Sequence, residues 1–109
     1  MSTVNAFTPK GKSYLVTTAS VQIKTQDNVN AVSYRIVNVT AAPVTLGWAP
    51  ADPTGAAVTV AAPSIATAGS PTNTLTFLSG AIEIVSLPPN VWLRSDTATS
   101  LIVTPGEGI

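Results

Sequence analysis

The sequence predicts an all-β fold, a single antiparallel β-sandwich with about eight to nine short strands. Two observations predict it. Apolar and polar residues alternate with a period of two in short segments along most of the chain, and turn-forming residues separate these segments. No segment shows the period of about 3.6 residues that is typical of an amphipathic helix. A chain of 109 residues is long enough for one domain with a two-layer core.

The alternating segments are distributed over the whole chain. They span residues 14–16, 21–24, 32–36, 44–48, 58–60, 75–77, 82–84, 91–93 and 101–103. Alternate residues of a strand point to opposite faces of the sheet, so we expect the apolar residues of each segment to face the core. In the segment 82–84 this places Ile82 and Ile84 in the core and Glu83 in solvent.

One long segment departs from the alternation. Between residues 49 and 73 the composition shifts to Ala, Pro, Gly, Thr and Ser, with four prolines. A loop of this length in a compact domain is typical of a binding loop or arm, and an ordinary solvent loop with one edge strand fits equally well. We therefore expect an amino-terminal arm (residues 1–12), a sandwich domain (residues 13–104) that contains the long loop (residues 49–73), and a flexible carboxyl-terminal tail (residues 105–109).

The composition argues against most kinds of chemistry. The chain has no histidine and no cysteine, and only five basic and five acidic residues. These residue types supply most general bases, activated nucleophiles and soft metal ligands. The net charge of the chain is zero, so the sequence also gives no sign of the excess of basic residues expected of a nucleic-acid-binding protein. The amino end has no signal-peptide pattern, and no apolar run approaches the roughly 18 residues of a membrane span, so we expect synthesis in the cytoplasm and no membrane partner.

Two groups of polar residues resemble parts of a catalytic or metal site, but an ordinary role as surface and turn residues explains them better. Glu83 and Asp96 could in principle form the carboxylate pair of a glycosidase, but their positions favour solvated acids on a strand and in a turn. Asp27, Asn28 and Asn30 resemble a fragment of a calcium loop that lacks its glycine and bidentate glutamate, and turn residues explain them better. We therefore predict no enzymatic activity, catalytic residue, cofactor, metal or small-molecule substrate.

The expected binding residues are aromatic, proline and arginine side chains outside the apolar phase of the strands. Trp92 is out of phase with Val91 and Leu93 and adjoins Arg94, a combination that is enriched at interfaces. The amino-terminal arm and the long loop add an apolar anchor and stiff prolines, which lose little entropy when a partner orders them. The predicted protein interface comprises Phe7, Pro9, Pro53, Pro63, Trp92 and Arg94.

Several short patterns carry a resemblance to a known group of proteins. They are the segment around Phe7, the segments Tyr-Arg-Ile-Val-Asn (residues 34–38) and Val-Thr-Leu-Gly-Trp (residues 44–48), and the ending Val-Thr-Pro-Gly-Glu-Gly (residues 103–108). Together they resemble small β-sandwich virion proteins of tailed bacteriophages. The resemblance implies a jelly-roll-like head decoration, or cement, protein. Such a protein is synthesised in the host cytoplasm, binds the capsid exterior, and bridges major capsid protein subunits; the family has no catalytic residues.

Two further expectations accompany this resemblance. Apolar residues on both faces of some strands, as at Leu101 and Ile102, predict a homo-oligomer, a dimer or trimer on the capsid lattice. The long loop of residues 49–73 has no counterpart in the family pattern. The alternative is a carbohydrate- or receptor-binding module of a phage tail fibre or other virion appendage, with Trp92, Trp48 or Tyr34 as stacking platforms. Binding to assembled particles and binding to glycans distinguish the two.

Overall fold

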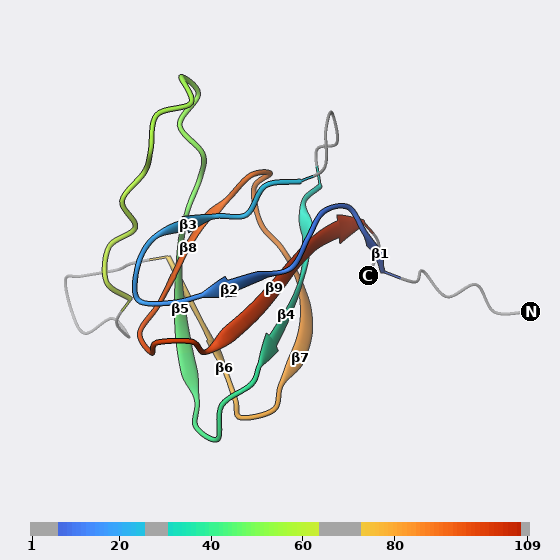
Figure 1. The fold of residues 1–109 in the computed structure, drawn as a ribbon, viewed down its shortest axis with the longest axis vertical. Coiled ribbons are helices and arrows are strands. Elements are labelled where there is room, and N and C mark those ends of the chain that lie inside the picture. Colours follow the sequence, from blue (N-terminus) through green and yellow to red (C-terminus); the bar gives the residue numbers. More distant parts are fainter. Residues whose placement is uncertain (1–6, 26–30, 64–72, 108–109) are drawn as a thin grey trace, which may run out of the picture.

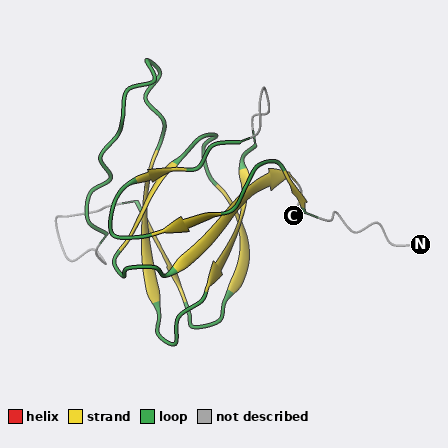
Figure 2. Ribbon diagram, viewed as in Figure 1, coloured by secondary structure: helices red, strands yellow, loops and turns green. Residues whose placement is uncertain are grey.

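The computed structural model describes residues 7–25, 31–63 and 73–107, and within these residues it contains nine strands and no helix. Figure 2 shows the strands and the loops that join them. The strands are β1 (Thr8–Pro9), β2 (Tyr14–Val16), β3 (Val21–Gln22), β4 (Ser33–Asn38), β5 (Val44–Ala49), β6 (Thr74–Phe77), β7 (Ile82–Ser86), β8 (Trp92–Ser95) and β9 (Leu101–Glu107). The prediction of an all-β sandwich is confirmed.

The strands form two antiparallel sheets, whose arrangement Figure 1 shows. Sheet A has the order β1-β9-β4-β7, with β2 also paired to β9, and sheet B has the order β3-β8-β5-β6. The pairing is nested: β2 pairs with β9, β3 with β8, β4 with β7, and β5 with β6. Successive nested pairs alternate between the two sheets. A long antiparallel ribbon rolled up in this way is the jelly-roll arrangement.

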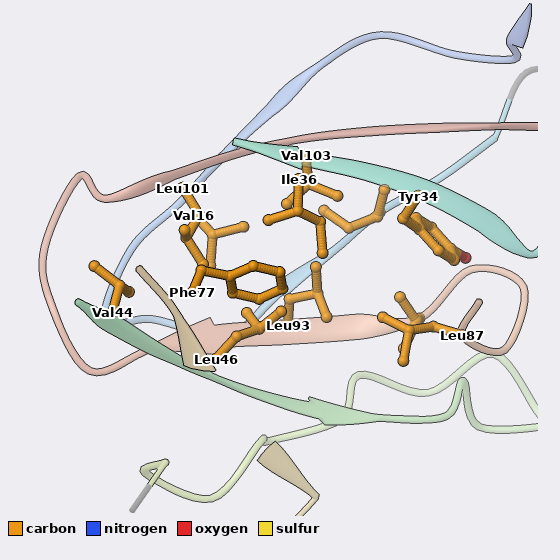
Figure 3. Packing of buried hydrophobic residues seen from close by; sticks show 12 residues of the cluster. Val16, Tyr34, Ile36, Val44, Leu46, Phe77, Leu87, Leu93, Leu101 and Val103 are labelled. Atoms are coloured by element: carbon orange, nitrogen blue, oxygen red, sulfur yellow. The ribbon is translucent and has the colours of Figure 1, made fainter. Parts of the chain in front are cut away.

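The core lies between the two sheets. In Figure 3, side chains of β4 and β9 point from one sheet toward side chains of β5 and β8 in the other. The buried cluster comprises Val16, Ile23, Tyr34, Ile36, Val44, Leu46, Phe77, Leu87, Val91, Leu93, Leu101 and Val103. Most of these are the apolar residues of the alternating segments. Full burial of each such side chain contributes about 1.5–3 kcal/mol, so the alternation sets which face of each strand turns inward.

In β7, the residues that point toward the core are not the ones that the alternation predicted. Glu83 is paired with Ile36 and shares the inward phase of Val85, whereas Ile82 is paired with Val37 and lies on the outer face. Ile82 is 60% exposed and Ile84 is half-buried. β7 is the edge strand of sheet A, where an inward position near the rim still reaches solvent. A charge at such a position also discourages edge-to-edge pairing with another sheet.

The two ends of the described chain are more ordered than expected. β9 continues through Pro105 and Gly106 to Glu107, residues that we expected in a flexible tail, and Pro105 and Gly106 are buried. Part of the expected arm forms β1, which pairs with the end of β9, and the Lys10 amide donates a hydrogen bond to the Pro105 carbonyl at 2.8 Å. The pairing satisfies backbone groups at both ends at once. Residues 1–6 and 108–109 lie outside the described part.

The long loop contains no strand in its described part, residues 50–63. In Figure 1 this segment, coloured green to yellow-green, extends beyond the strands at the top of the view and returns. The turn at its tip is closed by a hydrogen bond from the Gly55 amide to the Asp52 carbonyl at 2.9 Å. Residues 56–63, which we name the strap, run back toward sheet B, and the expected strand at residues 58–60 does not form. Residues 64–72 lie outside the described part.

Candidate protein interface on sheet A

The structure places the six predicted interface residues in three different regions of the molecule. Phe7 and Pro9 lie at β1, beside the end of β9 in sheet A. Trp92 and Arg94 lie on β8 of sheet B, and Pro63 lies in the strap above Gly47 of β5. Pro53 is exposed in the turn at the tip of the long loop. The six residues therefore do not form one surface.

Arg94 is used by the protein's own strap. Its Nη1 donates a hydrogen bond to the Val60 carbonyl at 3.0 Å, and the Val60 amide donates to the Ser20 hydroxyl at 2.9 Å. Val60 is only 3% exposed. The strap passes so close to β5 that a Cβ on Gly47 would lie 3.2 Å from the Pro63 Cβ. Sheet B is therefore partly covered on its outer side by residues of the same chain.

Trp92 has the outward phase that the sequence predicts, but it is half-buried rather than exposed. It lies between Gln22 of β3 and Ala49 of β5, its partners in register. Its indole Nε1 and the Nε of Arg94 are both buried, and neither has a hydrogen-bond partner within the described residues. Trp92 therefore offers a neighbouring molecule only part of its ring.

Phe7 packs against its own domain. A Cβ on Gly106 would collide with the Phe7 ring and with the Thr8 carbonyl, so the ring lies directly over this glycine. Phe7 is half-buried there, and Pro9 beside it is exposed. In the structure of the single chain, the predicted anchor Phe7 therefore packs on β9 of its own sandwich.

The outer face of sheet A carries an apolar surface that the sequence analysis did not assemble. Four aliphatic side chains lie in register across four strands: Leu15 of β2, Ile102 of β9, Val37 of β4 and Ile82 of β7. We name them the aliphatic row. Leu15 is 48% exposed, Ile102 37% and Ile82 60%. Apolar residues on both faces were visible in the sequence at Ile102, but their alignment across strands depends on the topology.

A pocket of about 580 Å³ adjoins the aliphatic row on the same face. It is lined by Phe7, Pro9, Gly11, Lys12, Ser13, Arg35 and Thr104. Arg35 and Thr104 are register partners, two residues along β4 and β9 from Val37 and Ile102. The hydroxyl groups of Ser13 and Thr104 form a hydrogen bond of 2.6 Å. The side chain of Arg35 is exposed and makes no hydrogen bond or ion pair within the described residues.

The carboxylates considered in the sequence analysis are not combined in one site. Glu83 lies on the edge strand β7 of sheet A, whereas Asp96 follows β8 of sheet B. The Oδ1 of Asp96 accepts a hydrogen bond from the Thr45 amide at 3.1 Å. Among the described residues no group of three or more His, Cys, Asp or Glu side chains is placed to hold a metal ion. Asp27, Asn28 and Asn30 lie outside the described part.

The proposed stacking platforms of the alternative hypothesis are largely enclosed. Tyr34 is fully buried, and its hydroxyl donates a hydrogen bond to the Pro88 carbonyl at 2.6 Å. Trp48 has the inward phase of β5 and packs against the core. Tyr34 therefore presents no face to a sugar, and Trp48 and Trp92 are each only partly exposed.

Comparisons with protein-family models, curated proteins and solved structures found no significant match. In the described part of the chain, no helix meets the length and hydropathy needed to cross a membrane. The interpretation of the outer face of sheet A therefore rests on its geometry and on the resemblance seen in the sequence.

Proposed function

We propose that the protein is a non-enzymatic structural component of a tailed-bacteriophage virion. It binds the exterior of the capsid and stabilises the lattice by bridging major capsid protein subunits, as a decoration or cement protein does. The sequence resemblance and the jelly-roll arrangement support the assignment to this class, since jelly rolls are common in viral capsid proteins. Fold alone does not define function, so the argument for binding depends on a surface.

The observation that carries the proposal is the aliphatic row. Leu15, Ile102 and Ile82 expose large parts of their side chains in one row on the outer face of sheet A, where water contact is unfavourable. Burial of one such side chain against a partner contributes up to about 1.5–3 kcal/mol. The face is built on paired strands, so little conformational entropy is lost when it docks. A contact of this size per copy is strengthened when several attachment points act together.

The proposal includes a homo-oligomer, a dimer or trimer, that assembles on the lattice. Attachment through more than one copy gives the avidity that a modest contact needs. The tip of the long loop is suited to a second contact, because Asp52 and Thr54 form a turn that is already ordered: the Asp52 Oδ1 accepts hydrogen bonds from the Thr54 amide and hydroxyl at 2.7 and 2.6 Å.

Co-sedimentation with assembled particles tests this function. We expect the purified protein to sediment with heads of the virus that encodes it, and Ile82→Asp to reduce bound protein at least about tenfold, because a buried carboxylate replaces an apolar contact. Thr18→Asp is the matched control, since Thr18 is exposed in the loop between β2 and β3. Unchanged binding of Ile82→Asp would contradict the proposed surface. Glycan binding that Trp92→Ala abolishes, without any particle binding, would favour the alternative function.

A further inference from the structure

We infer that the pocket beside the aliphatic row receives a carboxylate from the partner polypeptide that docks on sheet A. The inference rests on the proposed docking function and adds the chemistry of the partner: an extended aliphatic segment that carries an acidic side chain. Three features of the outer face support it, namely the charge of the pocket, its continuity with the aliphatic row, and the absence of acidic residues among the outward positions of the described strands.

The pocket combines cationic, hydroxyl and apolar groups. Arg35 and Lys12 are both lining residues, and no acidic residue belongs to the described lining. The Lys12 ammonium lies 5.7 Å from the centroid of the Tyr14 ring, a contact that favours one position of this flexible side chain. The guanidinium of Arg35 has no ionic partner among the described residues. A planar guanidinium beside hydroxyl donors is well suited to bind a carboxylate through two hydrogen bonds.

The two acidic residues on the strands of sheet A do not supply this counter-charge. Glu83 is paired with Ile36, so it has the opposite phase from Arg35, and it is not a lining residue of the pocket. Glu107 is paired with Thr8 at the end of β9 and is not a lining residue of the pocket. Successive side chains of a strand alternate between faces, so Glu107 has the opposite phase from Thr104 and Gly106. Although the whole chain has a net charge of zero, this part of its surface is positively charged.

The pocket and the aliphatic row form one continuous surface. Arg35 and Val37 are two residues apart on β4 and point to the same face, so their Cα atoms are separated by about 6.7 Å. Two residues of an extended partner segment span the same distance. A segment with an aliphatic residue over Val37 therefore places the side chain two positions along it at the pocket. An acidic residue there pairs with Arg35.

A second copy of the chain does not satisfy the pocket through the same face. The outward residues of β2, β4, β7 and β9 are Leu15, Ser33, Arg35, Val37, Ile82, Ile84, Ser86, Ile102, Thr104 and Gly106. This set contains a cation and no acidic residue, so self-association face to face supplies no counter-charge for Arg35. A face-to-face dimer is therefore not the occupant of this pocket, and we assign the complementary segment to a different polypeptide.

Nuclear magnetic resonance titration of the full-length, ¹⁵N-labelled protein tests the inference with two probes. These are the peptide acetyl-Val-Thr-Val-Thr-Glu-amide, which has two valines and the carboxylate on one face when extended, and its counterpart ending in Gln. We expect the Glu peptide to shift the amide resonances of Arg35, Val37 and Thr104 and to bind at least about fivefold more tightly than the Gln peptide. In Arg35→Gln the difference between peptides should fall below about twofold. Lys24→Gln, an exposed cation outside the pocket, should preserve it.

Four results would overturn the inference: equal binding of the two peptides, binding of neither, a Glu preference that survives Arg35→Gln, or resonance shifts confined to other surfaces. Equal binding on the aliphatic row would leave the proposed docking function intact, because that function requires only the apolar contact. Failure of the proposed function is recognised separately, in particle sedimentation of Ile82→Asp. The dispersed amide spectrum of each variant shows directly that it is folded.

Discussion

Asn38 shows how one buried polar side chain can hold two turns together. It is 1% exposed at the end of β4. Its Nδ2 donates to the carbonyl groups of Ala42, Phe77 and Leu78 at 2.9–3.0 Å, and its Oδ1 accepts from the amide and hydroxyl of Thr40. These contacts join the β4–β5 turn to the β6–β7 turn. The buried Nδ2 is also the atom that glycosylation of the Asn-Val-Thr sequence (residues 38–40) would require, and in the folded domain this atom is enclosed.

Replacement of this residue should destabilise the whole domain. We expect Asn38→Ala to lower the free energy of unfolding by about 1–3 kcal/mol, because buried carbonyl groups lose their donor without gaining water. Urea denaturation followed by tryptophan fluorescence measures the change. Ser86→Ala, at an exposed position of β7, is the control. Equal midpoints for Asn38→Ala and the control would show that the turns do not depend on this side chain.

Tyr34 is the buried titratable residue of the core. Burial raises the pKa of its hydroxyl above the usual value of 10.0. The folded protein therefore retains this proton at pH values where the unfolded chain has lost it. The unfolded state then binds fewer protons, so the stability contributed at neutral pH is lost as the pH rises above about 10.

The alkaline loss of stability should depend on this hydroxyl. We expect the free energy of unfolding of the native protein to fall more steeply above about pH 10 than that of Tyr34→Phe. At neutral pH, Tyr34→Phe should cost about 1 kcal/mol, since the hydrogen bond to the Pro88 carbonyl is lost. Urea denaturation at a series of pH values measures both effects. Parallel curves for the two proteins above pH 10 would be inconsistent with a raised Tyr34 pKa.

At the scale of elements, β1 depends on the absence of a side chain in β9. Gly106 lies where the Phe7 ring and the Thr8 carbonyl approach the backbone of β9, and any Cβ would displace them. β1 has only two residues and forms few backbone hydrogen bonds, so its attachment to the sandwich depends on this close contact. The wall of the candidate pocket formed by Phe7 and Pro9 depends on the same contact.

Gly106→Ala should release β1 while the sandwich stays folded. We expect trypsin to cleave after Lys10 and Lys12 about tenfold faster than in the native protein, because local opening exposes the backbone that the protease needs. Mass spectrometry of the early fragments measures the rate, and Ser86→Ala again serves as the control. Cleavage at the native rate would show that β1 accommodates a methyl group at this position.

At the scale of the whole molecule, the two faces of sheet A differ in their exposure to water. Its inner face carries fully buried residues such as Ile36, and its outer face carries Ile82, which is 60% exposed. Both residues are isoleucines on neighbouring strands of the same sheet. Only the inner one contributes to a core that excludes water on all sides, so the outer one is available for contact with another molecule.

The same substitution at these two positions should show that Ile36 is needed for the fold and that Ile82 is not. We expect Ile36→Thr to lower the free energy of unfolding by at least about 2 kcal/mol, since it leaves a cavity and buries a hydroxyl group. Ile82→Thr should change it by no more than about 0.5 kcal/mol, as is usual for exposed positions. Urea denaturation of the three proteins measures this. A loss of more than 2 kcal/mol in Ile82→Thr would mean that the outer face is needed for the fold.

The alternation of apolar and polar residues along the chain predicted more of the fold than of the candidate site. The alternation placed eight of the nine strands, and it oriented Ile36, Leu46 and Leu93 correctly because an apolar side chain gains more from burial than any competing effect. It failed for β7, where both phases contain apolar residues and the edge position, rather than hydropathy, decides which phase is solvated. It also missed β1, whose two residues have no alternation of their own.

The sequence by itself determined the all-β class, the single core and the scarcity of reactive side chains, since these follow from composition and from the period of two along the chain. Only the tertiary structure decided that Arg94 holds the strap and that Phe7 lies over Gly106. It alone also aligned Leu15 of β2 with Ile82 of β7, through nested pairings of residues far apart in the sequence. Such a surface depends on strand order and register, which no local pattern specifies.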